Sequence, residues 1–229
     1  MTDADPAGGP ATPTLRQEGD VWVLHLGDGE NRFRPDWVGA ITEHLDRVEA
    51  RPAPRALVTT AGGKIWSNGL DLDWIGEHPD EAGPFLADVH RLFARFLGSS
   101  VPTVAAIGGH AFAAGAMLAT AHDDLVMRAD RGYFCVPEVD LGLPFTEGMN
   151  ALLQSRWSKR TAHEAMTTGR RYGGEEALAA GIVQEAVPAD EVLTRAFERA
   201  TRLAGKDPAT FRAIKQRLYS HALSVLDPD

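Results

Sequence analysis

The sequence predicts an α/β core followed by a C-terminal helical region. Short apolar runs typical of buried strands alternate with amphipathic helical stretches up to Phe145, and consecutive helices follow. Because strands separated by helices of this length are joined by crossovers, we expect parallel strands. The length of 229 residues suits one domain of moderate size, or one with a small appendage.

Strands are expected at residues 21–27, 55–63, 101–107, 124–130 and 132–139, with a short one at 182–187. Helices are expected at residues 34–54 and 79–100, where apolar residues recur every three to four positions, and from the glycine-rich stretch 109–118. Further helical patterns occupy residues 146–157, 158–169, 173–181, 189–205 and 207–223. The chain therefore divides into a core of residues 15–188 and a helical region of residues 189–229.

Residues 1–14 are acidic and rich in proline and glycine, and they lack the basic and apolar segments of a signal peptide. They are predicted to be a disordered leader. Cys135 is the single cysteine, which excludes an intramolecular disulfide and indicates a reducing compartment. No apolar run approaches the ~18–20 residues of a membrane span. Together these observations predict a cytoplasmic protein without a membrane partner.

The formal net charge of −9 argues against a nucleic-acid partner, since such partners need a basic face. A small polyanionic ligand is not excluded, because it needs only a few local cations. No cluster of acids and histidines has the spacing of metal ligands. We therefore expect no metal site.

The first chemical motif is "GKIWSNGLDLDW" at residues 63–74, where a glycine-flanked turn leads to a helix expected from about Asp71. Backbone N–H groups at a helix start have no partner within the helix, so they can hold an anion or a developing oxyanion. The alternative is an N-cap, in which Ser67, Asn68 or Asp71 accepts those N–H groups. Composition alone favours the cap.

The second motif is "GGHAFAAGAML" at residues 108–118. Its glycines match neither the dinucleotide-binding pattern nor the P-loop, and no lysine follows to meet a phosphate. It offers a second set of helix-start amides, with side chains small enough for a ligand to come close. The alternative is close packing inside the core.

The third motif is "FCVPEVDLGLPF" at residues 134–145, in which Glu138 sits among apolar residues. Apolar surroundings raise the pKa of a carboxyl group, which suits a general base near neutral pH. The alternative is that Glu138 faces solvent or an ion-pair partner. The glycine and proline that follow predict a turn, so Asp140 is expected to cap or brace the loop, and Cys135 is expected to be an inert packing residue.

Together and in this order, the three motifs resemble the crotonase (enoyl-CoA hydratase/isomerase) superfamily over residues 21–188. "IWSNGLDL" is similar to the family's first oxyanion-hole turn, "AAIGGHAFAAGAMLATAHDD" to the second, and "ADRGYFCVPEVDLGLPF" to the segment with the catalytic carboxylate. "TGRRYGGEEALAAGIVQEAVP" is similar to the stretch after the core. The resemblance implies a crotonase-like spiral core of ββα repeats, an acyl-CoA thioester as substrate, and no separate cofactor.

The resemblance also assigns roles to residues of this chain. The backbone N–H groups of Leu70 and Ala114 would form an oxyanion hole for the thioester oxygen, and Glu138 would be the catalytic acid/base. The substrate-binding positions would be Lys64, Ser67, Asn68, Gly69, Asp71 and Met117.

Met117 is the informative departure, because hydratases of the family carry a glutamate there that helps to position water. With Glu138 as sole carboxylate, the pattern is most similar to the Δ3,Δ2-enoyl-CoA isomerases, and Met117 would line the acyl pocket. One alternative is a hydratase, or another enolate-stabilising crotonase, that recruits Asp140 or Glu147 as a second acid. Another is a non-catalytic acyl-CoA-binding subunit, against which the retained Glu138 counts.

Cations for the CoA phosphates are expected among Lys64, Arg32, Arg34 and Lys215. The family also implies a homotrimer or a dimer of trimers, with the helical region of residues 189–229 in the trimer contacts.

Overall fold

The computed structural model describes residues 12–228, and its larger sheet holds six strands in the order β1-β2-β4-β7-β9-β11. These strands are β1 (Thr14–Glu18), β2 (Val21–His25), β4 (Ala56–Thr60), β7 (Thr103–Ile107), β9 (Asp124–Arg128) and β11 (Glu185–Val187). β1 pairs antiparallel with β2, and the other neighbouring pairs are parallel. The predicted α/β core with parallel strands is therefore confirmed.

Five shorter strands form two small parallel sheets. They are β3 (Arg32–Phe33), β5 (Ile65–Ser67), β6 (Gly69–Leu70), β8 (His110–Phe112) and β10 (Phe134–Cys135). β10, β8 and β5 pair in that order, and β3 pairs with β6. Along the chain, a strand of the large sheet is followed by a small-sheet strand and then a helix, as in β7, β8 and α4 (Ala114–Thr120). This is the ββα spiral that the resemblance implies.

The other helices are α1 (Pro35–Glu49), α2 (Leu72–Glu77), α3 (Ala82–Gly98), α5 (Glu138–Leu141), α6 (Glu147–Arg156), α7 (Lys159–Thr168), α8 (Gly174–Ala179), α9 (Val192–Leu203), α10 (Pro208–Leu218) and α11 (Ser220–Leu226). Thr146, Ser158 and Asp207 cap three of them by accepting the N–H three residues further on. None of the helices within residues 12–228 has the length and apolar character that a bilayer crossing requires.

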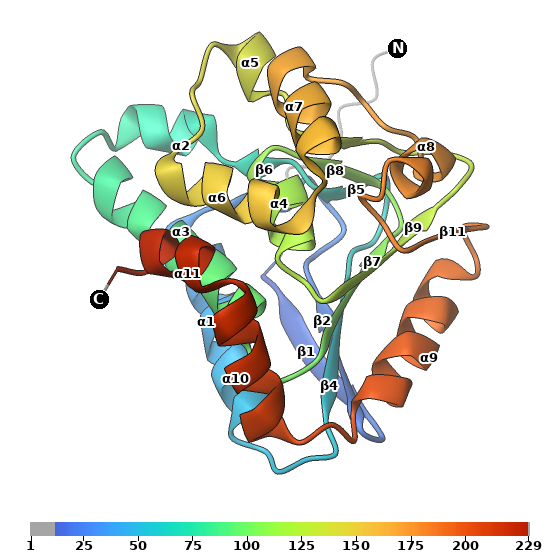
Figure 1. Cartoon of the computed structure of the whole chain (residues 1–229). Coiled ribbons are helices and arrows are strands. Elements are labelled where there is room, and N and C mark those ends of the chain that lie inside the picture. The colour runs from blue at the N-terminus through green and yellow to red at the C-terminus, as the bar shows by residue number, and fades with distance from the viewer. Residues whose placement is uncertain (1–11, 229) are drawn as a thin grey trace, which may run out of the picture.

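Both faces of the large sheet are covered, as Figure 1 shows, because its central strands are apolar on both sides. On one face, α9 packs its Val192, Ala196 and Ala200 against Val58, Val104, Ala106 and Val126. On the other face, the main core combines Leu57, Ala105 and Ile107 with Ile41, Phe93 and Leu118 of the helices α1, α3 and α4. The second motif thus enters the core through α4, which is buried at every position.

Two predicted boundaries in the first part of the chain are wrong. Thr14 is the first residue of β1 and pairs with His25, so the predicted leader of residues 1–14 is too long, and its residues 1–11 lie outside the described part. The strand predicted at residues 132–139 ends at Cys135. Pro137, which has no N–H for a sheet ladder, begins the turn into α5, so that Glu138 lies on a short helix.

The helix predicted at residues 207–223 is two helices. They meet at Tyr219, whose φ of −109° and ψ of 21° leave the helical region. The break turns α11 onto α3 and α6, where its Ala222 and Leu226 are buried. Tertiary packing therefore overrides a continuous helical pattern at this point.

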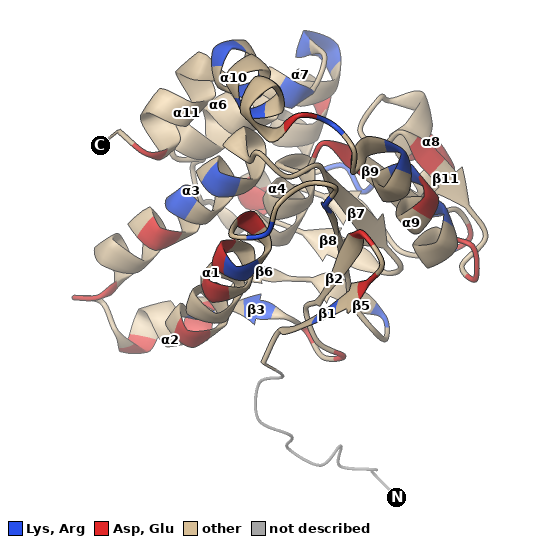
Figure 2. Ribbon diagram, turned by 90° about the horizontal axis from the view of Figure 1, so that it is seen from below, with Lys and Arg blue, Asp and Glu red and all other residues tan. Residues whose placement is uncertain are grey.

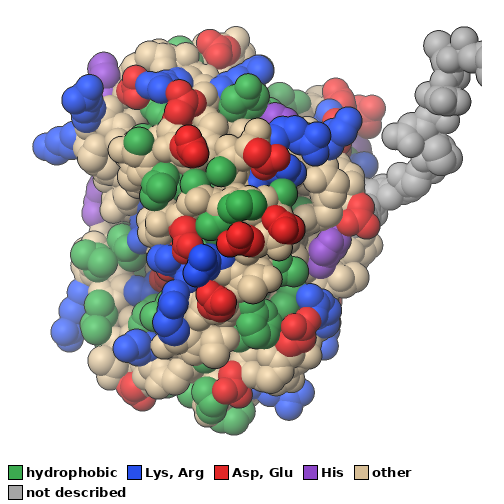
Figure 3. Space-filling view, turned by 90° about the vertical axis from the view of Figure 1, so that its right-hand side faces the viewer, with side chains coloured by type: hydrophobic (Ala, Val, Ile, Leu, Met, Phe, Trp, Pro, Cys, Tyr) green, Lys and Arg blue, Asp and Glu red, His purple; other side chains and the backbone are tan. Residues whose placement is uncertain are grey.

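Charged residues are distributed over several helices. In the view of Figure 2, α1 and α9 carry both signs, α8 is acidic and α10 is basic. Figure 3 shows the side of the molecule on which α9 lies, with acidic and basic side chains intermixed. There Arg195 and Arg199 of α9 both bind Glu185, at 3.0 and 2.9 Å, and so tie the helix to β11.

Candidate active site

The three sequence motifs meet because their strands are neighbours in one small sheet. Ser67 of β5 is paired with Ala111 of β8, and Ala111 with Phe134 of β10, all in parallel. Parallel strands end at a common edge of their sheet, so the segments that follow them emerge side by side. These segments carry the Leu70 amide, the Ala114 amide and Glu138, respectively.

Gly69 joins the first motif directly to the second. Its φ is +79°, where side chains are strained, and a Cβ there would lie 2.7 Å from the Ala114 nitrogen and 3.0 Å from the Phe112 oxygen. Glycine is therefore required, both by backbone conformation and by space. The turn before Leu70 consequently lies against the Ala114 amide.

The N–H of Leu70 is not used by the sheet. The Asp71 N–H donates to the Phe33 carbonyl of β3 at 3.0 Å. Because successive N–H groups of a strand point in opposite directions, the Leu70 N–H points away from β3. Within residues 12–228, β6 has β3 as its one sheet neighbour, so no second ladder takes up this N–H.

Asp71 caps α2, as one interpretation of the first motif predicts. Its carboxylate accepts the Trp74 N–H at 3.2 Å, and the residue is 9% exposed. The carboxylate is thus committed to the helix start rather than to a ligand, in contrast to the substrate-binding role predicted for it. The cap leaves the neighbouring Leu70 N–H untouched.

Ala114 is the first residue of α4, so its N–H has no acceptor within the helix. The preceding residue, Ala113, has φ 51° and ψ −128° and supplies no side-chain cap. The Ala113 N–H donates to the Cys135 carbonyl at 3.0 Å, which fixes the start of α4 to the end of β10. A backbone conformation that is rare for alanine is therefore held by a specific hydrogen bond.

Glu138 is the buried acid of the site. It is 7% exposed, and burial raises the pKa of its carboxyl group from 4.5 to about 7. Its Oε2 is buried and has no hydrogen-bond partner among the described residues. A carboxyl group with this pKa and a free oxygen suits proton transfer near neutral pH.

Buried polar atoms without a hydrogen-bond partner occur at the sheet edge where the segments after β5 and β10 emerge. Five buried side-chain atoms within residues 12–228 have no partner, and two of these are Glu138 Oε2 and Asn68 Oδ1. Buried polar atoms are normally hydrogen-bonded, so two free acceptors in predicted site residues indicate groups available to a ligand or to water. Asn68 also donates its backbone N–H to the Glu30 carbonyl at 3.0 Å, which holds the turn in place.

Two of the predicted substrate-binding residues are fully enclosed. Ser67 and Met117 are both 0% exposed. The Ser67 hydroxyl donates to the Asn31 carbonyl and accepts the Gly69 N–H. Met117 lies three residues after Ala114, on the same face of α4, and is part of the main core.

The predicted CoA-phosphate role of Lys215 is wrong. Lys215 is 4% exposed, its Nζ lies 2.7 Å from Asp123 Oδ1, and it donates to the Phe96 carbonyl at 3.1 Å. Burial lowers the pKa of Lys215, and the charge of Asp123 opposes that shift. Its ammonium group anchors α10 to α3 and is unavailable to a phosphate.

The other residues predicted to bind the CoA phosphates, Lys64, Arg32 and Arg34, lie in two different places. Lys64 precedes β5, at the amino end of the small sheet, and lines a hollow with His110, Arg128 and Arg131 there. The structure therefore does not bring Lys64 to the edge with Glu138. Arg32 Nη1 lies 3.0 Å from Asp73 Oδ2 and Arg34 Nε lies 3.7 Å from Asp71 Oδ2, which places both beside the first turn.

Burial holds two further reactive side chains, Cys135 and His122, in their neutral forms. Burial raises the pKa of the Cys135 thiol to about 11 and lowers the pKa of His122 to about 3. Cys135 is thus a thiol that donates to the Gly169 carbonyl at 3.2 Å, as expected for a packing residue. Within residues 12–228 no group of three or more His, Cys, Asp or Glu side chains could hold a metal ion.

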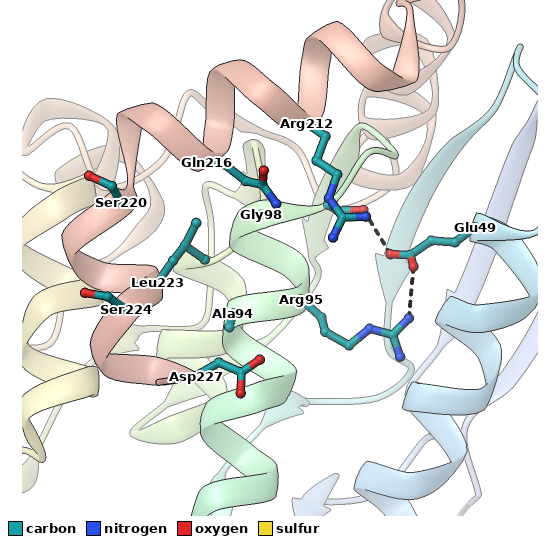
Figure 4. A pocket seen from close by; sticks show the side chains of 11 residues that line it. Glu49, Ala94, Arg95, Gly98, Arg212, Gln216, Ser220, Leu223, Ser224 and Asp227 are labelled. Carbon is teal, nitrogen blue, oxygen red and sulfur yellow. Dashed lines mark hydrogen bonds and ion pairs between the residues drawn. The ribbon is translucent and has the colours of Figure 1, made fainter. Parts of the chain in front are cut away.

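A cavity of about 500 Å³ lies elsewhere, between α3 and the helices α10 and α11 (Figure 4). Glu49 accepts hydrogen bonds there from Arg95 at 3.1 Å and from Ser99 at 3.4 Å. The cavity therefore offers an acid already paired with a cation, and no residue of the edge described above lines it. It lacks the free, buried base that proton transfer needs.

One residue of the site escaped the sequence prediction. Asn31 is 7% exposed, has a φ of 49°, and donates its side chain to the Trp66 carbonyl at 3.0 Å. Asparagine tolerates positive φ better than most residues, and this was its only local signal. Two of the carbonyls that accept from it, those of Ile65 and Trp66, lie more than 30 positions away, which local patterns do not reveal.

The family model described as "Enoyl-CoA hydratase/isomerase" matches residues 17–227. The chain is 34% identical over 226 residues to "Enoyl-CoA delta isomerase 2, peroxisomal" of Arabidopsis thaliana, covering 93% of this chain and 94% of that protein. It is also 34% identical over 211 residues to a "Putative enoyl-CoA hydratase" of Thermus thermophilus, covering 88% and 81%.

Solved structures agree with this fold. An apo enoyl-CoA isomerase of Mycobacterium tuberculosis has a TM-score of 0.87 and 27% identity, with 94% of both chains covered. A second structure of that protein is described as a probable enoyl-CoA hydratase. Human mitochondrial Δ3,Δ2-enoyl-CoA isomerase, at 21% identity, shares the fold with a TM-score of 0.88 over 93% of this chain and 85% of that one.

Proposed function

The chain belongs to the enoyl-CoA hydratase/isomerase family, and we propose that this enzyme shifts an acyl-CoA double bond, from 3-enoyl-CoA to 2-trans-enoyl-CoA. The observation that carries the proposal is the single buried carboxyl group with a free oxygen, Glu138, at the edge shared by the two amide turns. The names of the Arabidopsis relatives support the same reaction.

Glu138 takes a proton from C2 of the substrate and returns it to C4. As the proton leaves C2, negative charge moves onto the thioester oxygen and a dienolate forms. The N–H groups of Leu70 and Ala114 donate to that oxygen. Loss of one such donor costs about 3–4 kcal/mol of transition-state stabilisation. The proton then returns at C4, the double bond lies between C2 and C3, and Glu138 is again a carboxylate.

Other residues have supporting roles in this proposal. Asn68 offers its free Oδ1 to the substrate or to an ordered water, and Gly69 keeps the first turn close to the second. Arg32 and Arg34, which lie beside the first turn near Asp73 and Asp71, are the cations that we propose for the CoA phosphates. Met117 supplies an apolar wall behind the amides.

A hydratase requires a second acid that positions water, and the two candidates are poorly placed for it. Asp140 and Glu147 are exposed, whereas Glu138 is buried. The Asp140 carboxylate lies against Gly169, where an added Cβ would come 2.4 Å from Oδ2. These positions favour the isomerase. A non-catalytic acyl-CoA-binding subunit would have no use for a buried carboxyl group whose pKa is raised to about 7.

The test compares conversion of 3-enoyl-CoA to 2-trans-enoyl-CoA by wild type, Glu138→Gln and the exposed control Glu147→Gln. We expect Glu138→Gln to lose at least a hundredfold in kcat, within the range that general acid–base catalysis contributes (about 10²–10⁴), and Glu147→Gln to keep wild-type turnover. Near wild-type turnover by Glu138→Gln would refute the proposal. Hydration of crotonyl-CoA as fast as isomerisation would favour the hydratase. Binding of acyl-CoA without turnover of any enoyl substrate would favour the non-catalytic acyl-CoA-binding subunit.

Assembly and location remain proposals. A homotrimer or dimer of trimers, with the helical region of residues 189–229 in the contacts, is testable by light scattering of the purified protein. Cytoplasmic location rests on the single cysteine, and two Arabidopsis relatives are named as peroxisomal. Fractionation of the source cells distinguishes the two locations.

A further inference from the structure

We propose that Ser67 is a positioning residue, which, held by Asn31, fixes the first turn so that the Leu70 amide meets the thioester oxygen. This inference rests on the proposed isomerase function. It replaces the substrate-binding role that the sequence predicts for Ser67, because the residue is 0% exposed and cannot touch a ligand.

The Ser67 hydroxyl links the two sides of the turn. Its Oγ donates to the Asn31 carbonyl at 2.7 Å and accepts the Gly69 N–H at 3.1 Å. Gly69 immediately precedes the Leu70 amide and has a positive φ, so its orientation sets where that amide points. A hydroxyl group can both donate and accept, which no apolar replacement does.

Asn31 is itself rigidly held. Its Nδ2 donates to the Trp66 carbonyl at 3.0 Å, to the Ile65 carbonyl at 3.2 Å and to the Gly27 carbonyl at 3.3 Å. Two of these bonds join the loop that precedes β3 to β5, the strand that leads into the first turn. The carbonyl that accepts from Ser67 therefore belongs to a residue with little freedom to move.

Ser67 also contacts the second turn. A Cβ on Gly115, the second residue of α4, would lie 2.6 Å from the Ser67 carbonyl oxygen and 2.7 Å from its Cβ. Ser67 thus packs against the backbone next to the Ala114 amide. Displacement of this one residue changes the spacing of both proposed oxyanion donors.

Removal of the hydroxyl therefore affects the transition state more than substrate binding. The oxyanion forms only during reaction, so a misplaced Leu70 amide lowers kcat, whereas KM reflects contacts present before reaction. Glu138 is untouched, so the pH midpoint of the reaction stays the same.

Ser99→Ala is a matched control. Ser99 is 4% exposed, and its Oγ accepts the Val101 N–H at 3.0 Å, the same two-residue pattern as in Ser67 and Gly69. It lies after α3, at the cavity of Figure 4 and away from the amide turns. The two alanine variants therefore remove similar hydroxyls, and only one removal reaches the proposed site.

The experiment measures kcat and KM for 3-enoyl-CoA, together with amide hydrogen exchange of the peptide covering residues 66–72. We expect Ser67→Ala to lose about tenfold or more in kcat with KM within about twofold, and to exchange faster in that peptide, while Ser99→Ala does neither. Ser67→Cys, which keeps the shape, serves if Ser67→Ala does not fold.

Equal kcat in the two alanine variants, or unchanged exchange in residues 66–72, would overturn the positioning role. An inactive wild type would instead refute the isomerase function. Exchange in the same peptide would still decide whether Ser67 holds the turn.

Discussion

The buried carboxyl group of Glu138 has a measurable consequence for folding that does not depend on activity. Burial raises its pKa from 4.5 to about 7, so the folded protein holds this proton over a pH range in which the unfolded chain releases it. The contribution of Glu138 to stability is fully present below about pH 4.5 and is lost as the pH rises through about 7. Glu138→Gln removes this titration while keeping the shape of the side chain.

The magnitude follows from the size of the shift. One pKa unit corresponds to about 1.4 kcal/mol, and the shift from 4.5 to about 7 therefore to about 3 kcal/mol. Relative to wild type, the free energy of unfolding of Glu138→Gln should increase by that amount between about pH 4 and pH 8. At low pH the difference between the two proteins is constant, because Glu138 is then protonated in both folded and unfolded states.

Urea unfolding followed by tryptophan fluorescence, at one protein concentration and at each pH, measures this difference. Glu43→Gln, an exposed substitution on α1, is the control and should show no rise of this size. In parallel, kcat/KM of the wild type should increase with pH and level off above a midpoint near 7, because the carboxylate is the base. A difference between Glu138→Gln and wild type that stays the same at every pH would refute the reasoning.

Two further substitutions test the first turn of the site and the anchor that holds α10 to α3. Gly69→Ala should lower kcat at least a hundredfold, because its Cβ would meet the Ala114 nitrogen at 2.7 Å, whereas Gly19→Ala, with a similar φ of +60° and open space, should leave steady-state kinetics unchanged. Lys215→Met should reduce the free energy of unfolding by about 1.5–3 kcal/mol, because it removes the buried ammonium group that pairs with the partly buried Asp123 carboxylate, while exposed Lys206→Met should not change it. Steady-state kinetics measures the effect of the two glycine variants, and calorimetric unfolding measures the effect of the two lysine variants. A selective rise in KM for acyl-CoA in Lys215→Met would contradict the anchoring role of Lys215.

Local sequence patterns predict well those elements that burial of one face specifies. The apolar runs that became β2, β4, β7 and β9 and the amphipathic helices α1 and α3 lie where predicted, because burial requires those periodicities. Asp71 caps α2 as its position indicates. The third motif predicts Glu138 as the buried acid, and the resemblance to the family adds Leu70 and Ala114 at the segments that follow β5 and β8.

The remainder depends on partners far away in the chain. β3, β5, β6, β8 and β10 contain two or three residues each, too few for a periodic pattern, and exist through pairing with one another. The helical pattern around Lys215 predicts an exposed side chain. Its partners Asp123 and Phe96 lie far away in the sequence and bury it. Ser67 is predicted to face a ligand from the first turn, whereas its hydroxyl donates inward to the Asn31 carbonyl.

Two unusual backbone conformations lie beside the amide turns of the proposed site. Asn31 and Ala113 are the two non-glycine residues with positive φ in residues 12–228, and both adjoin the amide turns. Glu138 is buried without a partner for Oε2 in the same place. Each feature costs stability, roughly 1–3 kcal/mol for an unusual backbone conformation, so folding alone would not select them together. Two strained residues and a buried acid without a partner, all near the amide turns, therefore support the proposed site on physical grounds alone.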